Sequence, residues 1–101
     1  YLGIGMCDIT DTERLFYNKV IIDDDIKYGV VILEVDEKSA AGKAKLKKGD
    51  VVIEVAGEKI KSVAQFRYEL YKHTPGDVIE VKYIRNGKEK SVEIKLTENN
   101  N

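Results

Sequence analysis

The strongest constraint on the fold lies near the end of the chain, where an alternating apolar pattern flanks an Asn-Gly pair. Apolar residues recur at every second position on both sides of it, at Ile79, Val81 and Tyr83 and then at Val92, Ile94 and Leu96. Such alternation is typical of half-buried strands. Asn86-Gly87 favours the type I′ turn, whose twist suits two antiparallel strands. The sequence therefore predicts a β-hairpin, which any fold of this chain has to accommodate.

Further strands are indicated upstream of the hairpin. The β-branched run at residues 29–35 is the clearest, and residues 51–55 are almost entirely Val and Ile. Residues 2–9 form a weaker candidate because they contain two glycines, and residues 58–60 form a short one. With the two arms of the hairpin, the chain is expected to have about six short strands.

Helical signals are fewer than strand signals. Ser62 is the best N-cap in the chain, and Pro75-Gly76 ends the helix that follows it. The apolar residues of this helix recur at helical spacing, at Val63, Phe66 and Leu70. A turn of helix is expected after Asp11 and a short helix after Ser39. The pattern predicts an α+β, mainly β domain: a small curled sheet capped by two helices, without a parallel α/β alternation.

Composition excludes several classes of function. With 101 residues, the chain suffices for one domain and is too short for a two-domain trypsin-like enzyme. Its 17 Lys and Arg against 18 Asp and Glu leave a net charge of −1, whereas a nucleic-acid-binding domain is expected to be basic. Its longest apolar stretch is far shorter than the roughly 20 residues that span a bilayer. We therefore expect a globular domain with no nucleic-acid partner and no direct membrane span.

The residues that could take part in catalysis, disulfide formation or metal binding lack the second residue or the spacing that these roles require. Cys7 is the only cysteine, so no internal disulfide can form; we expect a small strand residue, with a reactive thiol as the less favoured alternative. His73 is the only histidine, and near a helix C-terminus it fits dipole stabilisation. The consecutive acids Asp23-Asp24-Asp25 lack the alternating spacing of an EF-hand and indicate a solvated loop. The sequence thus predicts no catalytic residue, no metal and no cofactor.

Two other interpretations are weaker. The Gly3-x-Gly5 pair fits an ordinary bulged strand, or else the start of a dinucleotide-binding fingerprint, which needs a third glycine and a helix that do not follow. A free-standing hydrolase would have to combine His73 with one of three serines, and none of these lies in a nucleophile elbow. The serines are Ser39, Ser62 and Ser91.

Several segments together resemble a known family. Tyr1-Leu2-Gly3-Ile4 resembles the carboxylate-binding loop of bacterial PDZ domains, and residues 39–52 are similar to the family's SPAxxAGLxxGDxI segment. Residues 55–60 match its following strand and turn. Pro75-Gly76-Asp77 and the Arg85-Asn86-Gly87 hairpin close the domain as in the HtrA/Deg serine proteases. The resemblance implies a PDZ-like curled partial β-barrel of five to six strands capped by two helices, with the circularly permuted strand order of the bacterial members.

The likeness extends from Tyr1 to about Leu96, so we expect a PDZ domain over residues 1–97 and a disordered tail at 98–101. Two positions depart from the family's pattern. Ala40 replaces the usual proline, and Lys45 replaces a glycine that commonly takes a left-handed conformation. That conformation disfavours any residue with a Cβ, so the local turn is expected to differ.

The resemblance also implies a binding site. The amides of Leu2, Gly3 and Ile4 are expected to hold a peptide's C-terminal carboxylate, as a nest of N–H groups holds an anion. The peptide is expected to pair as an added strand with Ile4, Gly5, Met6, Cys7 and Asp8. The expected specificity pocket has Leu2, Ile4, Phe66 and Leu70 around the terminal side chain, Met6 and Val63 around the next inward-facing one, and Arg67 on the rim.

The implied function is a peptide-binding module of an HtrA-like serine endopeptidase in protein quality control. Its partners would be protein C-termini with an apolar last residue and a catalytic domain elsewhere in the parent chain. Such proteases usually work outside the cytoplasm, in the cell envelope or anchored to the outer face of a membrane. The alternative is a PDZ-like regulatory domain of a C-terminal-processing or intramembrane protease.

Overall fold

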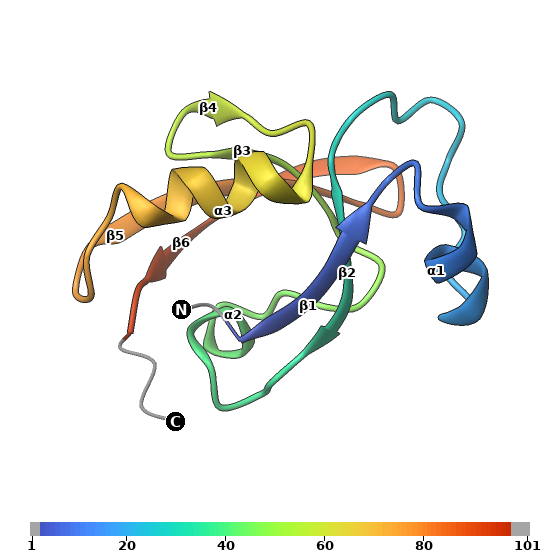
Figure 1. The fold of residues 1–101 in the computed structure, drawn as a ribbon. Helices are drawn as coiled ribbons and strands as arrows, with labels where there is room; N and C mark the ends of the chain where they lie inside the picture. The colour runs from blue at the N-terminus through green and yellow to red at the C-terminus, as the bar shows by residue number, and fades with distance from the viewer. Residues whose placement is uncertain (1–2, 98–101) are drawn as a thin grey trace.

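The computed structural model describes residues 3–97, which form one antiparallel sheet with three helices (Figure 1). The strands are β1 (Ile4–Asp8), β2 (Val30–Val35), β3 (Val51–Val55), β4 (Glu58–Lys59), β5 (Val78–Arg85) and β6 (Lys88–Lys95). The helices are α1 (Thr12–Tyr17), α2 (Ala40–Lys43) and α3 (Val63–Tyr71). The prediction of a mainly β fold with five to six strands is confirmed. The tail expected to be disordered, 98–101, lies outside the described residues, as do Tyr1 and Leu2.

The strands follow the order β1-β2-β3-β5-β6, and β4 pairs with β3. Strands β1 and β6 are therefore the first and last strands of this order and lie at opposite edges of the sheet. The predicted hairpin is confirmed by the pairing of Arg85 with Lys88 across a two-residue loop. Asn86 and Gly87 have φ of 53° and 76°, and two positive φ values are what a type I′ turn requires.

Side chains form a separate apolar cluster on each face of the sheet. Neighbouring residues in β3 show the alternation, since Val52 belongs to the larger cluster and Val51 to the smaller one. The larger cluster includes Phe66 of α3, and the smaller one includes Leu15 of α1 and Cys7 of β1. The sheet thus has α3 on one face and α1 on the other.

The helix starts agree with the predicted N-caps. Side-chain oxygens accept hydrogen bonds from backbone N–H groups three residues ahead: Asp11 from Arg14 at 3.2 Å, Ser39 from Gly42 at 3.2 Å and Ser62 from Gln65 at 3.1 Å. One helix is longer than the single turn expected after Asp11, because α1 extends from Thr12 to Tyr17. The sheet therefore has three helices around it, where two helices and a single turn of helix were expected.

The chain leaves α2 through a left-handed residue. Lys45 has φ of 69°, and the N–H of Leu46 donates to the carbonyl oxygen of Ala41 at 3.1 Å. A bond spanning five residues around a left-handed position is typical of a helix end that favours glycine. Lys45 takes this conformation despite its Cβ, which disfavours it by about 1–2 kcal/mol. The expectation that the turn differs here is therefore wrong: with Lys45 in place of the family's glycine, the left-handed turn is kept.

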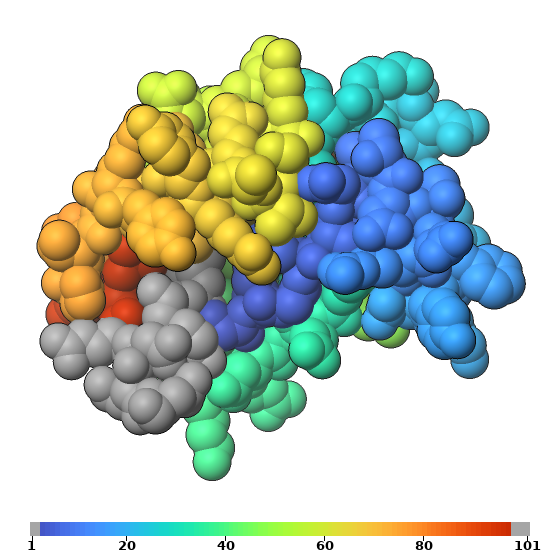
Figure 2. Space-filling view, viewed as in Figure 1, coloured from blue at the N-terminus to red at the C-terminus, as the bar shows by residue number. Residues whose placement is uncertain are grey.

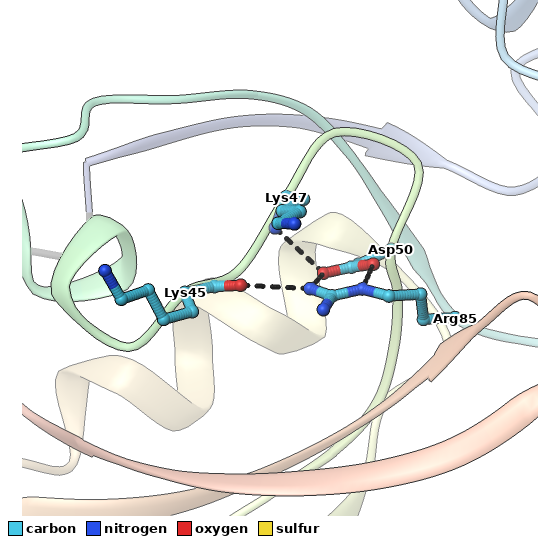
Figure 3. A network of polar contacts seen from close by, with 4 residues as sticks. All are labelled: Lys45, Lys47, Asp50 and Arg85. Atoms are coloured by element: carbon cyan, nitrogen blue, oxygen red, sulfur yellow. Dashed lines mark hydrogen bonds and ion pairs between the residues drawn. The ribbon is translucent and has the colours of Figure 1, made fainter.

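An ion pair between buried Asp50 and half-buried Arg85 ties this turn to the hairpin (Figure 3). Asp50 is only 2% exposed, and its carboxylate accepts hydrogen bonds from Arg85 Nε at 2.8 Å and from Arg85 Nη2 at 2.6 Å. The same Nη2 donates to the carbonyl oxygen of Lys45 at 3.0 Å, and the N–H of Lys47 donates to Asp50 at 2.8 Å. This pairing raises the pKa of Arg85 above its ordinary value. The network fixes the turn after α2 against the end of β5.

Candidate functional site

The first strand has an open edge. It pairs with β2 on one side, and no strand among residues 3–97 pairs with its other side. Helix α3 lies beside that edge, and Figure 2 shows β1 (blue) at the surface next to α3 (yellow). The two elements are joined where β1 ends and α3 begins, because the N–H of Val63 donates to Asp8 Oδ1 at 2.7 Å. An unpaired edge of this kind is a template for an added strand.

A hollow of about 890 Å³ lies between the edge of β1 and α3. Its volume is within the range of about 300–1,000 Å³ that is usual for ligand sites. The hollow is lined from β1 and its entry by Gly3, Ile4, Gly5 and Met6, from β2 and its exit by Glu34, Val35 and Asp36, and from α3 and its exit by Phe66, Arg67, Leu70, Tyr71 and His73. It therefore combines an apolar wall with charged groups and an open strand edge.

Gly3 shapes one end of the hollow. It has φ of +75°, and its carbonyl oxygen accepts a hydrogen bond from the N–H of Asp36 at 2.9 Å. A Cβ placed on Gly3 would overlap the side chain of Ser39, whose Oγ would lie only 2.6 Å away. Ser39 itself is held in place, since its Oγ donates to the carbonyl oxygen of Asp36 at 2.6 Å. The positive φ and the close approach both require glycine at this position.

The structure brings most of the predicted site residues together. Seven of them line the hollow: Gly3, Ile4, Gly5, Met6, Phe66, Arg67 and Leu70. Val63 does not line it, and instead packs against the larger apolar cluster. Leu2, expected both in the carboxylate loop and in the pocket, lies outside the described residues.

The remaining two predicted residues of β1, Cys7 and Asp8, do not line the hollow. Cys7 is 2% exposed and belongs to the cluster on the opposite face of the sheet. Burial, followed by the charge of Asp11, raises the pKa of the Cys7 thiol above its ordinary value, which keeps the thiol protonated and unreactive. The carboxylate of Asp8 is engaged by Val63. Both residues contribute backbone to the strand edge.

Sequence reasoning missed five residues that line the hollow, namely Glu34, Val35, Asp36, Tyr71 and His73. Glu34 and Val35 belong to β2, which pairs with β1, and Asp36 follows β2; no local sequence signal connects these three residues to β1. Gly5 pairs with Glu34 and Met6 with Ile32, so a bulge in β2 at Leu33 sets the register. The bulged-strand interpretation of the two glycines thus holds in part, with the extra residue in the partner strand.

Two of the three serines considered for a hydrolase serve as helix caps. His73 Nδ1 lies 3.6 Å from Asp77 Oδ2, whereas the hydroxyls of Ser39 and Ser62 cap α2 and α3. In the described part of the chain, no three His, Cys, Asp or Glu side chains gather where they could hold a metal ion. None of the described helices has the length and apolarity needed to cross a membrane.

Comparison with known sequences gives one consistent result. A family model described as PDZ domain matches residues 1–96. The serine protease HtrA-like of Staphylococcus epidermidis is 40% identical over 90 residues, which are 88% of this chain and 15% of that protein. The serine protease Do-like HtrA of Bacillus subtilis is 36% identical over 99 residues, covering 95% of this chain and 22% of that protein. The chain thus spans less than a quarter of the length of these relatives.

Comparison with solved structures gives the same fold. The HtrA-type protease AlgW with decapeptide superposes with a TM-score of 0.78 at 18% identity, over 96% of this chain and 28% of that one. The HtrA3 PDZ domain bound to a phage-derived ligand, FGRWV, superposes with a TM-score of 0.73 at 16% identity, over 94% of this chain and 82% of that one. At these identities the likeness establishes the arrangement of the strands and helices.

Proposed function

This chain belongs to the PDZ domain family, and from that premise we propose that it binds the C-terminal carboxylate of peptides whose last residue is apolar. The open edge of β1 beside the hollow is the observation that carries the proposal. An extended peptide added there takes main-chain hydrogen bonds from β1, and its alternate side chains enter the space below α3. Two of the similar structures are named as complexes with peptides.

The proposed carboxylate site lies at the entry to β1. Successive N–H groups around a residue of positive φ form a concave nest that suits an anion, and Gly3 supplies that residue. The amides of Leu2, Gly3 and Ile4 are the proposed donors. Ile4, Phe66 and Leu70 line the hollow nearby and favour an apolar terminal side chain. Backbone donors need no basic face, in keeping with a net charge of −1.

The test is calorimetry with the pentapeptide FGRWV, once as the free acid and once with an amidated C-terminus. We expect the acid to bind in the micromolar range, about −8 kcal/mol, and the amide to bind at least tenfold more weakly. A third peptide, FGRWD, is expected to lose affinity because its terminal side chain is charged. Equal affinity of acid and amide would show that the carboxylate is not recognised.

We further propose that the chain is the peptide-recognising part of an HtrA-like serine endopeptidase that acts in protein quality control outside the cytoplasm. The support is its similarity to one segment of two HtrA relatives. The chain covers 15% of the full length of one relative and 22% of the other. The coding sequence adjoining this segment tests the proposal. A trypsin-like domain with a Gly-x-Ser-Gly-Gly segment is expected, whereas a C-terminal-processing or intramembrane protease would favour the alternative parent.

A further inference from the structure

Glu34 of β2 reaches the open edge of β1 across a glycine. It pairs directly with Gly5 in the sheet register. A Cβ placed on Gly5 would lie 2.8 Å from Glu34 Cγ and 3.1 Å from Glu34 Oε1. The Glu34 side chain therefore lies over Gly5, in space that any other residue at position 5 would fill. Both residues line the hollow, so the carboxylate of Glu34, which belongs to β2, faces a ligand that pairs with β1.

The two sides of the hollow carry opposite charges. Glu34 and Asp36 lie on the β2 side and are exposed, and neither forms an ion pair within residues 3–97. On the side of α3, the cation Arg67 is exposed. A ligand cation near Glu34 therefore meets two carboxylates that no other described side chain neutralises.

The position of that cation follows from the geometry of strand addition, and this step rests on the proposed function. A peptide whose carboxylate lies at the entry to β1, and whose chain continues toward Asp8, runs antiparallel to β1. Its last residue then lies beside Ile4 and its penultimate residue beside Gly5. Residues directly opposite each other in an antiparallel pair point to the same face of the sheet. The penultimate side chain thus points to the face on which Glu34 covers Gly5.

Distance also favours this contact. Neighbouring strands lie about 4.8 Å apart, so a side chain that stayed above β2 would be about two such spacings from the peptide. Because Glu34 lies over Gly5, its carboxylate is instead about one spacing away, which the long side chain of Lys or Arg spans easily. We propose that Glu34, reaching across Gly5, selects peptides with Lys or Arg as the penultimate residue. The ligand class is a C-terminus in which a cation precedes an apolar last residue.

Three peptides that differ at one position measure the selection: acetyl-FGSKV, acetyl-FGSQV and acetyl-FGSEV, all as free acids. We expect Lys to bind about two- to fivefold tighter than Gln, as exposed ion pairs contribute modestly, and Glu to bind more weakly than Gln. The preference is expected to shrink when the salt concentration is raised from 50 to 500 mM, because exposed charges are screened. A fourth peptide, acetyl-FGKSV, moves Lys to the inward-facing position and is expected to gain nothing from Glu34.

Protein variants assign the preference to the contact. Glu34→Gln is expected to abolish the preference for Lys over Gln, and Glu34→Lys to reverse it in favour of Glu. Glu37→Gln makes the same charge change at a neighbouring exposed position that does not line the hollow, and is expected to keep the preference. Gly5→Ala leaves every charge in place but pushes the flexible Glu34 side chain aside, so it is expected to weaken the preference.

The outcomes separate this inference from the function on which it rests. If the acids bind and their amides do not, but Lys, Gln and Glu bind alike, the PDZ function stands and the role of Glu34 is wrong. The role is also wrong if Glu34→Gln keeps the preference, or if FGKSV shows the larger dependence on Glu34. If no free acid binds better than its amide, the proposed function fails and the selection by Glu34 falls with it.

Discussion

The contact between Asp8 and Val63 is expected to hold the two walls of the hollow together. It joins residues 55 positions apart, and its N–H is one of the first of α3, where the helix has no acceptors of its own. Ser62 serves the N–H of Gln65, so Asp8 supplies a second, separate cap. Asp8→Ala removes this acceptor and its charge. The variant is therefore expected to lower the free energy of unfolding and to loosen α3 against β1.

The magnitude follows from the kind of bond that is lost. A hydrogen bond to a charged group contributes about 1.5–3 kcal/mol, and a carboxylate at a helix N-terminus about 0.3–1 kcal/mol. Asp8 and Val63 are only half-buried, so water replaces part of the bond in the variant. We expect Asp8→Ala to cost about 1–2 kcal/mol. Asp8→Asn keeps an acceptor oxygen and loses the charge, so it is expected to cost about 0.5–1 kcal/mol.

Urea unfolding followed by far-ultraviolet circular dichroism measures these costs, since the chain has no Trp for fluorescence. Asp24→Ala is the matched control. It removes an exposed carboxylate that makes no side-chain hydrogen bond in the described structure, and is expected to change stability by less than about 0.5 kcal/mol. Calorimetry with FGRWV is expected to show about three- to tenfold weaker binding by Asp8→Ala, because binding then has to order α3. Stability and affinity both matching the control would refute the reasoning.

Three further changes test other parts of the fold. Arg85→Met leaves the carboxylate of Asp50 buried without its cation; because the Arg85 side chain is 22% exposed, the expected cost in urea unfolding lies at the low end of the range for buried pairs, about 3 kcal/mol, and a cost below about 1 kcal/mol would contradict the pairing. Lys45→Gly relieves the left-handed strain and is expected to stabilise by about 0.5–1 kcal/mol, seen as a rise of a few degrees in Tm; a lower Tm would count against the strain. Because the folded state raises the pKa of Cys7, its contribution to stability is fully present below the ordinary value of 9.0 and is lost as pH rises above it. Urea midpoints at pH 8 and pH 10 are expected to show this loss in the wild type, and Cys7→Ala is expected to lack that part of it.

The local features of the fold were predictable from the sequence. The N-caps at Ser39 and Ser62 act within three residues along the chain, and Asn86-Gly87 determines its turn within two. The segment motifs led to the PDZ family, which the family match confirms. Such signals are readable because the residues that interact are neighbours in sequence.

The contacts that build the site were not predictable in the same way. Asp50 and Arg85 are separated by 35 positions, and each fits its own turn without reference to the other. Glu34 covers Gly5 only because a bulge at Leu33 sets the register between β1 and β2. A one-residue change of register would move every side chain of the strand to the other face. The charged side of the hollow therefore depends on strand pairing, which apolar patterns alone leave undetermined.

The two ends of the sheet differ in how they limit self-association. Unpaired strand edges invite pairing with further copies of a protein, and charged side chains are a common protection. The edge strand β6, with the sequence KEKSVEIK, is mostly charged and exposed. The opposite edge, at β1, has few charges and relies on α3 beside it. A strand added at β1 would meet the helix on its far side, so α3 would limit the extension of the sheet at this edge to one added strand.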